Sequence, residues 1–233
     1  MSTIRKVFSI LLCATVLFSA VNTHAQDSAA TPDVSNLIEK KPSDLYEQYR
    51  HLPKSASEFE PGDKWKYFGI MYGLQWGVYL VTQWETIEEH ASFDNWIHNP
   101  WTPDYDKDTY DYNIFKHAYS GQLYYQFYRS RGYDEVTAFY WTVASSMAFE
   151  FTIETMTEVP SFQDMYLTPV LGAVVGVGFE KLSLYYHSKK TLPYRLLGYV
   201  FNPFTLLPSS QYGYVAPIVS ENYKGVNVSW SFE

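Results

Sequence analysis

Cysteine is almost absent from this sequence. The chain of 233 residues has a single cysteine, Cys13, and it lies in an apolar run near the N-terminus. We expect this run to be removed as part of a signal peptide. The mature chain would then have no disulfide framework, no cysteine-ligated metal site and no thiol nucleophile.

Charge and the common catalytic signatures are also scarce. Charged residues make up 18% of the chain and the net charge is -8, whereas an average globular chain has roughly 25% charged residues. There is no run of Lys and Arg, which argues against a nucleic-acid partner, because phosphate neutralisation needs clustered basic side chains. The motifs G-x-S-x-G and H-E-x-x-H and a glycine-rich phosphate loop are missing, so the best-known hydrolase, zincin and nucleotide-binding signatures are excluded.

Aromatic residues are abundant, at 19% of the chain, which excludes disorder for the body of the protein. The N-terminus has a basic start at Arg5 and Lys6, an apolar run over 7–21 and a small-residue exit before Gln26. This layout predicts a cleaved secretory signal peptide over 1–25. We therefore expect a secreted protein that resides in the periplasm.

The rest of the chain predicts a mainly α fold. Residues 26–62 have the composition of a flexible polar lead, and 63–190 are expected to form a bundle of about four apolar, aromatic-rich helices. Residues 191–233 are expected to form an irregular aromatic segment, with no long helix, followed by a small C-terminal β-hairpin. The predicted helices cover 65–84, 112–131, 134–157 and 161–187, and the Asp-rich segment 91–112 is expected to be a loop.

A few polar residues interrupt the apolar helices at helical spacing. His117 shares a face with Asn113, one turn before it, and Ser146, Glu150 and Glu154 are each four residues apart and form one stripe. Two glutamates among apolar neighbours are unfavourable if they are buried without a partner. They must therefore be paired, protonated or hydrated.

Three interpretations of these residues remain open. In the first, the carboxylates belong to a structural network with Arg129, Asn113, His117 or the start of the fourth helix. In the second, a carboxyl group with a raised pKa acts with His117 in acid and base catalysis. In the third, His117, Glu150, Glu154 and Asp164 hold a metal ion, although the Glu-x-x-His pattern of di-iron bundles is missing. We predict no bound metal and no cofactor.

The spaced polar residues resemble a known bacterial envelope family. The pattern combines Asn113-x3-His117-x3-Gly121, Glu150-x3-Glu154 and Ser161-x-Gln163-Asp164-x3-Thr168-Pro169-x2-Gly172-x3-Gly176 over roughly 94–180. It is similar to the domain of unknown function 3943. A weaker likeness, Ser-x-x-Asp followed by Gly-x3-Gly, extends to VanZ-like helical membrane proteins. The resemblance implies a secreted, membrane-associated helical domain.

These observations together predict an envelope protein attached to the outer membrane, with a structural or binding role toward membrane lipid or an envelope protein. The alternative is a hydrolase or other acid/base enzyme that acts on a lipid or cell-envelope substrate. The catalytic candidates are His117, Glu150 and Glu154. The residues assigned to binding are Asn113, Arg129, Ser146, Asp164 and Thr168.

Overall fold

A computed structural model describes residues 62–107, 109–189, 191–206, 213–219 and 224–230. The predicted signal peptide and nearly all of the predicted polar lead lie outside this range. The described residues divide into two compact units between Val177 and Gly178.

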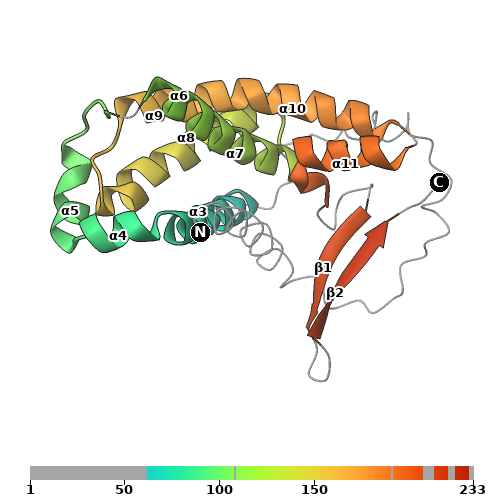
Figure 1. The fold of residues 1–233 in the computed structure, drawn as a ribbon, viewed down its shortest axis with the longest axis horizontal. Coiled ribbons are helices and arrows are strands. Elements are labelled where there is room, and N and C mark those ends of the chain that lie inside the picture. The colour runs from blue at the N-terminus through green and yellow to red at the C-terminus, as the bar shows by residue number, and fades with distance from the viewer. Residues whose placement is uncertain (1–61, 108, 190, 207–212, 220–223, 231–233) are drawn as a thin grey trace. The chain divides into compact units, whose positions relative to one another are not determined.

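The chain is mainly helical, as the sequence predicts (Figure 1). The helical elements that begin in the first unit are α3 (Asp63–Thr82), α4 (Trp84–His90), α5 (Phe93–His98), η3 (Asn99–Trp101), α6 (Tyr110–Tyr112), η4 (Asn113–His117), α7 (Ala118–Ser130), α8 (Glu135–Ala148), η5 (Phe149–Ile153), η6 (Glu154–Met156), α9 (Phe162–Tyr166), η7 (Leu167–Leu171) and α10 (Gly172–His187).

Helix α3 packs against α8 and η5 with only one of its faces. Its buried residues are Met71, Leu74, Gln75 and Tyr79. Polar contacts fix this inner face, because the Gln75 side chain donates to the Ser145 carbonyl at 3.0 Å and the Tyr79 hydroxyl meets Thr157 Oγ1 at 2.5 Å. The outer face of α3 is apolar and exposed.

Helices α7 and α8 are joined by a tight turn, and α7 also packs on η7. The turn depends on Gly132, whose φ of 93° is favourable only for glycine. Asp134 then caps α8 by accepting a hydrogen bond from the Thr137 amide. Between α7 and the start of α10 the backbones touch: a Cβ on Gly172 would lie 2.5 Å from the Gly121 Cα. The two helices therefore approach each other closely at these two glycines.

Three short π-helical turns interrupt the predicted long helices. They are η4, η5 and η7. Each π turn widens the helix by one residue and shifts the phase of everything after it. In η7 the cause is Pro169, which has no amide hydrogen to donate within the helix. The predicted helix over 134–157 is helical from Glu135 to Met156, but its last third changes from α-helix to the π turn η5 and the 3-10 turn η6.

The predicted loop over 91–112 is also wrong over 93–101, where α5 and η3 form. Ser92 caps α5 by accepting from the Asn95 amide. The Trp96 indole N–H donates to the Thr152 carbonyl at 2.6 Å, and the Asn99 amide donates to the carbonyls of Thr155 and Glu158. These contacts tie the polar segment to η5 and η6, and such long-range anchors leave no local sequence signal.

The second unit contains the C-terminal part of α10, α11 (Leu192–Phe201) and η8 (Pro203–Leu206). Helix α11 replaces the irregular segment predicted there. It forms because Pro193 occupies its first turn, where no amide hydrogen is needed, and because its apolar side packs on α10 through stacked rings of Tyr186, Tyr194 and Phe201.

Two strands follow, β1 (Gly213–Val219) and β2 (Lys224–Trp230), paired antiparallel with Gly213 opposite Trp230. Their side chains and the connecting residues 220–223 lie outside the described part of the chain. The predicted terminal hairpin therefore stays a proposal.

One described stretch, Phe162–His187, is long and apolar enough to cross a membrane by length and composition alone. Its most apolar window is 44% buried inside the protein. A core helix of a soluble protein meets the same criteria, so this stretch alone does not place the chain in a membrane.

Candidate functional site

His117 is the last residue of the π turn η4 and is buried, with 7% of its surface exposed. Its Nδ1 lies 3.1 Å from Thr168 Oγ1, which comes from the π turn η7. When Nδ1 carries the proton and donates to Thr168, Nε2 is left with its lone pair. The contact with the Thr168 hydroxyl thus orients the imidazole so that Nε2 faces the site.

The other nitrogen of His117 faces a buried carboxyl group. His117 Nε2 lies 3.2 Å from Asp164 Oδ1, and Asp164 is 5% exposed. Asp164 stands in the first turn of α9, whose cap is Ser161: the Asp164 amide donates to Ser161 Oγ. This cap sets the position of Asp164.

Glu150 completes the cluster from another π turn, η5, and it is 1% exposed. The Ser161 amide donates to Glu150 Oε2 at 3.1 Å. One ligand atom from each of His117, Glu150 and Asp164 can be chosen so that all three lie within 4.8 Å of one another. Three π turns and one capped helix therefore bring together side chains that are up to 47 positions apart, from 117 to 164.

Ser161 also connects the cluster to the Asp-rich segment. Its hydroxyl donates to Asp106 Oδ2 at 2.7 Å, and the Asp106 amide donates to Gln163 Oε1 at 3.0 Å. The backbones pair next to this contact, since Asp104 and Ser161 form an isolated parallel bridge. Asp106 is thus held beside the cluster by both backbone and side chain.

A cavity of about 370 Å³ opens beside these residues, and His117 and Asp164 line it. Its other acidic lining residues are Asp106, Glu154 and Glu158, and two basic ones, Lys107 and Lys116, are also present. Glu158 and Lys107 are exposed, which places them on the solvent side of the cavity. Buried acidic groups at one end of a solvent-accessible cavity can bind a cation or exchange protons with a bound molecule.

Burial changes the protonation of the cluster. It lowers the pKa of His117 to about 4, helped by the positive charge of Lys116, and it raises the pKa of Asp164 to about 8, helped by the negative charges of Asp106 and Glu154. Burial and the charges of Glu154 and Asp164 also raise the pKa of Glu150 well above its usual range.

These pKa directions conflict with an ion pair, although His117 and Asp164 lie at ion-pair distance. We favour a neutral imidazole beside a protonated carboxyl group at pH 7. Three further carboxyl groups, those of Asp106, Glu150 and Glu154, lie near Asp164. Desolvation of an ionised pair at this depth outweighs its mutual attraction.

The structure brings several of the predicted site residues together. His117, Glu150, Asp164 and Thr168 meet in the cluster, and Glu154 lines the cavity. Arg129 lies elsewhere and donates to the Tyr133 carbonyl. Ser146 is buried but does not line the cavity, and the side chain of Asn113 lies outside the described residues.

Sequence reasoning missed Asp106 and Ser161 as site residues. The segment around Asp106 has five aspartates, four of them at 104, 106, 108 and 111, and nothing local distinguishes the one that meets Ser161. The start of the fourth helix, however, was among the expected partners of the glutamates, and the Ser161 amide fills that role.

Residues 102–204 match a family model described as a domain of unknown function (DUF3943). The chain resembles that family over this range. The matched range contains the whole cluster and its supports at Asp106, Ser161 and Thr168. No curated protein and no solved structure gives a significant match to the chain. The weaker likeness to VanZ-like proteins gains no support from these comparisons.

Proposed function

We propose that this chain is a secreted envelope protein of the periplasm that is attached to the outer membrane and binds membrane lipid through the outer face of α3. The exposed apolar stripe on that helix is the observation that carries the proposal. The predicted signal peptide supports the periplasmic location, and the terminal hairpin of β1 and β2 is proposed as a small appendage of this domain.

The stripe follows helical spacing along one side of α3. Trp65, Gly69, Gly73 and Leu80 lie within about a quarter turn of one another, at 100° per residue, and all are exposed. Trp84, at the start of α4, continues the stripe. Charged residues are nearly absent from it, so water contacts a strip of indole, leucine and bare glycine backbone.

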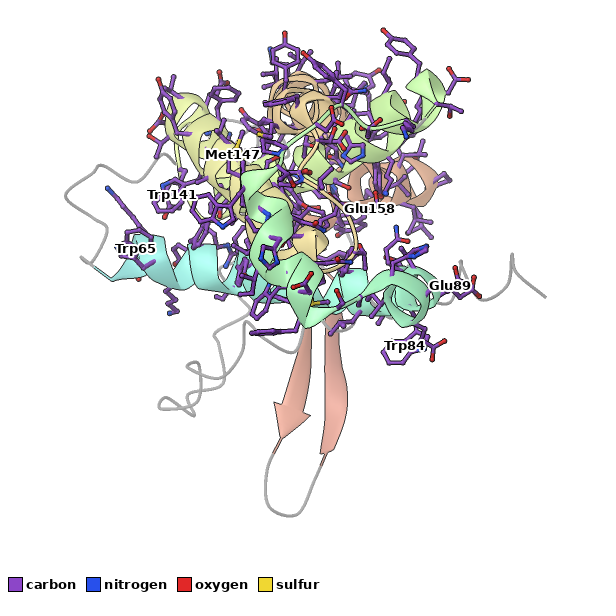
Figure 2. The ribbon with its side chains drawn as sticks, turned by 90° about the vertical axis from the view of Figure 1, so that its left-hand side faces the viewer. Trp65, Trp84, Glu89, Trp141, Met147 and Glu158 are labelled. Carbon is purple, nitrogen blue, oxygen red and sulfur yellow. The ribbon has the colours of Figure 1, made fainter. Side chains whose placement is uncertain are left out.

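The two tryptophans stand at opposite ends of the α3 and α4 layer (Figure 2). Trp65 is 69% exposed and Trp84 is 54% exposed. Tryptophan at both ends of an apolar segment is typical of the boundary between lipid and water, where the ring is buried and the indole N–H stays hydrated. A helix lying flat in the headgroup layer would use such a face.

Vesicle flotation tests this proposal. The purified mature chain is mixed with vesicles of phosphatidylethanolamine and phosphatidylglycerol in the presence of EDTA and centrifuged through a density gradient. We expect the wild type to float and the double variant Trp65→Ser, Trp84→Ser to bind at least about tenfold more weakly, because each buried indole contributes roughly 1.5–3 kcal/mol.

The matched control is Trp101→Ser, which removes an indole that is 83% exposed but lies in η3, away from the stripe. It should float like the wild type. An equal loss of binding in the control and the double variant would contradict the role of the stripe. So would full release of the protein from isolated membranes by a carbonate wash.

The cavity favours a second candidate function, an acid/base enzyme acting on a lipid or cell-envelope substrate. His117 and Glu154 line one cavity, and Glu150 meets His117 in the adjoining cluster. Carboxyl groups whose pKa is raised by burial can hold a proton at neutral pH and deliver it to a leaving group.

For the enzyme candidate, isolated envelopes are incubated with wild type or with Glu150→Gln, and the released lipids and sugars are separated by mass spectrometry. A product made by the wild type and absent with a folded Glu150→Gln protein supports catalysis. Identical product patterns for the two proteins contradict it.

A further inference from the structure

We propose that His117, Glu150 and Asp164 form a binding site for one divalent transition-metal ion of the zinc class. This inference goes beyond the lipid-binding proposal and differs from our sequence-based expectation that no metal is bound. It rests on how the donor atoms are placed, and it concerns a part of the first unit separate from the outer face of α3.

The first observation is the geometry of the donors. His117 Nε2 and Asp164 Oδ1 are 3.2 Å apart, and Asp164 Oδ1 is a buried oxygen with no hydrogen-bond partner. Two ligands that each lie about 2.0–2.2 Å from a metal ion are roughly 3–3.5 Å from each other. The two atoms therefore have the spacing of neighbouring ligands of one ion, without the alignment of a hydrogen bond between them.

The second observation is the burial of an acid-rich cluster. Glu150 and Asp164 are both at least 95% buried, and their carboxyl groups lie in one cluster with the His117 imidazole. Carboxyl groups that are withdrawn from water next to one another repel when ionised. A bound dication would compensate their charge at the point where the three side chains converge.

The third observation is that each of the three ligand residues has a second contact that fixes its orientation. Thr168 Oγ1 contacts His117 Nδ1, and the Ser161 amide donates to Glu150 Oε2. The Asp164 amide is fixed by Ser161 Oγ. Partners that orient the ligands in this way accompany most protein metal sites.

The donor set also selects the metal. One imidazole and two carboxylates suit Zn²⁺, Mn²⁺ or Fe²⁺ better than Ca²⁺ or Mg²⁺, which prefer sites made of oxygen atoms alone. Because His117 and Asp164 line the cavity, an ion bound there would keep a coordination position for water or a ligand on the cavity side.

The test uses the mature chain without an affinity tag, stripped with EDTA and dialysed against Zn²⁺. We expect one Zn²⁺ per chain by elemental analysis and titration calorimetry, and visible absorption bands when Co²⁺ is substituted. His117→Ala and Asp164→Asn should each weaken Zn²⁺ binding about 100-fold or more, and Thr168→Val about 10–100-fold, because Thr168 orients the imidazole.

The matched control is His98→Ala, which also removes a histidine next to an aspartate, since His98 Nδ1 lies 3.1 Å from Asp94 Oδ1 on the surface. Its Zn²⁺ affinity should equal that of the wild type. A wild type that binds no Zn²⁺ and no Mn²⁺, or a folded Asp164→Asn protein that binds as tightly as the wild type, would overturn the site. Circular dichroism confirms that each variant is folded.

The result is independent of the lipid-binding proposal. Flotation is measured in EDTA, so failure of the metal site leaves the flotation result unchanged. Failure of flotation likewise leaves the Zn²⁺ stoichiometry unchanged.

Discussion

Among the residues that the structure describes, each of the two units buries one histidine, and the two residues serve different purposes. His117 in the first unit and His187 in the second are both buried, and each contacts a threonine hydroxyl, Thr168 at 3.1 Å and Thr205 at 3.2 Å. Burial lowers the pKa of both, to about 4 for His117 and to about 3 for His187. His117 and His187 are therefore nearly alike in their burial, in the threonine they contact and in the direction of their pKa shift.

The surroundings of the ring distinguish them. His117 turns its second nitrogen toward the Asp164 carboxyl group, beside a cavity. The His187 ring packs edge-on against Tyr199 at 4.6 Å between ring centroids, and a Cβ on Gly198 would lie 2.7 Å from it. A buried histidine with a lowered pKa is therefore weak support for a site until its other neighbours are known. His187 is a packing residue.

The largest effect is expected where a glycine supports the His117 cluster. A Cβ on Gly121 would overlap the carbonyl oxygen of Thr168, in the π turn that orients His117. This neighbour is backbone and cannot move aside without shifting η7. Gly121→Ala should lower the free energy of unfolding by more than about 3 kcal/mol, as measured by urea denaturation.

Gly198→Ala is the comparison in the second unit. There the added methyl group meets the side chain of His187, which can rotate, so the loss should be smaller, about 1–2 kcal/mol. Equal losses in the two variants would show that the close approach of α7 and η7 is no more rigid than the packing around His187.

The stability of the protein at acidic pH should depend on His187. The folded-state pKa of His187 lies below the usual 6.5, so between these values the unfolded chain binds a proton that the folded chain excludes. The resulting stability is complete above about pH 6.5 and is lost as the pH falls toward 3. In His187→Leu the loss of unfolding free energy from pH 6.5 to 4 should be smaller, by about 2 kcal/mol.

The hydroxyl of Thr205 stays satisfied in that variant, because it also donates to the Asn202 carbonyl at 2.7 Å. Changing exposed His98 to Leu serves as the control and should leave the pH profile of the wild type. If His187→Leu loses stability as steeply as the wild type, His187 is protonated in the folded state and the comparison between the two histidines fails.

Glu150→Gln should separate stability from metal binding in the first unit. Burial and two neighbouring carboxyl groups raise the pKa of Glu150, so at pH 7 the group opposes folding, whereas an amide of the same shape carries no charge and can still accept from the Ser161 amide. We expect the free energy of unfolding of the metal-free variant to rise by about 1 kcal/mol at pH 7. The variant should also lose Zn²⁺ binding. A loss of stability comparable to that of Gly121→Ala would mean that the carboxylate is a structural group.

Much of this site could be predicted from the sequence, because polar residues that interrupt apolar helices at helical spacing are easy to recognise. His117, Glu150 and Glu154 stand out as exceptions on apolar helices, and Asp134 and Ser161 are residue types that favour the helix caps they form in the structure. These patterns involve only neighbouring residues, so they predict short elements correctly whatever the rest of the chain does.

The features that were missed depend on long-range contacts or on small changes of helical phase. Of the three π turns, only η7 has a visible cause, Pro169. The turn at η5 shifts Glu150 and Glu154 relative to Ser146, so the predicted common stripe does not persist: Glu150 reaches the cluster, Glu154 lines the cavity, and Ser146 does neither. Asp106 is brought to the cluster by the backbone bridge between residues 104 and 161, which are 57 positions apart. No local pattern indicates such a pairing.

The smallest effect is expected at a glycine without a packing neighbour, and it links the first unit to the membrane proposal. Gly73 lies in the exposed stripe of α3, where an added Cβ meets no atom within 4 Å. Gly73→Ala should therefore raise the free energy of unfolding by about 0.5–1 kcal/mol, through the higher helix propensity of alanine, and leave vesicle flotation unchanged, since fluid lipid accommodates one methyl group. Gly178 in α10 is also helical, and an added Cβ there meets no atom within 4 Å. Gly178→Ala therefore serves as the matched control for both stability and flotation. If Gly73→Ala weakens flotation while Gly178→Ala does not, the stripe fits a rigid partner surface rather than lipid, because only a close-packed neighbour would detect a single methyl group there.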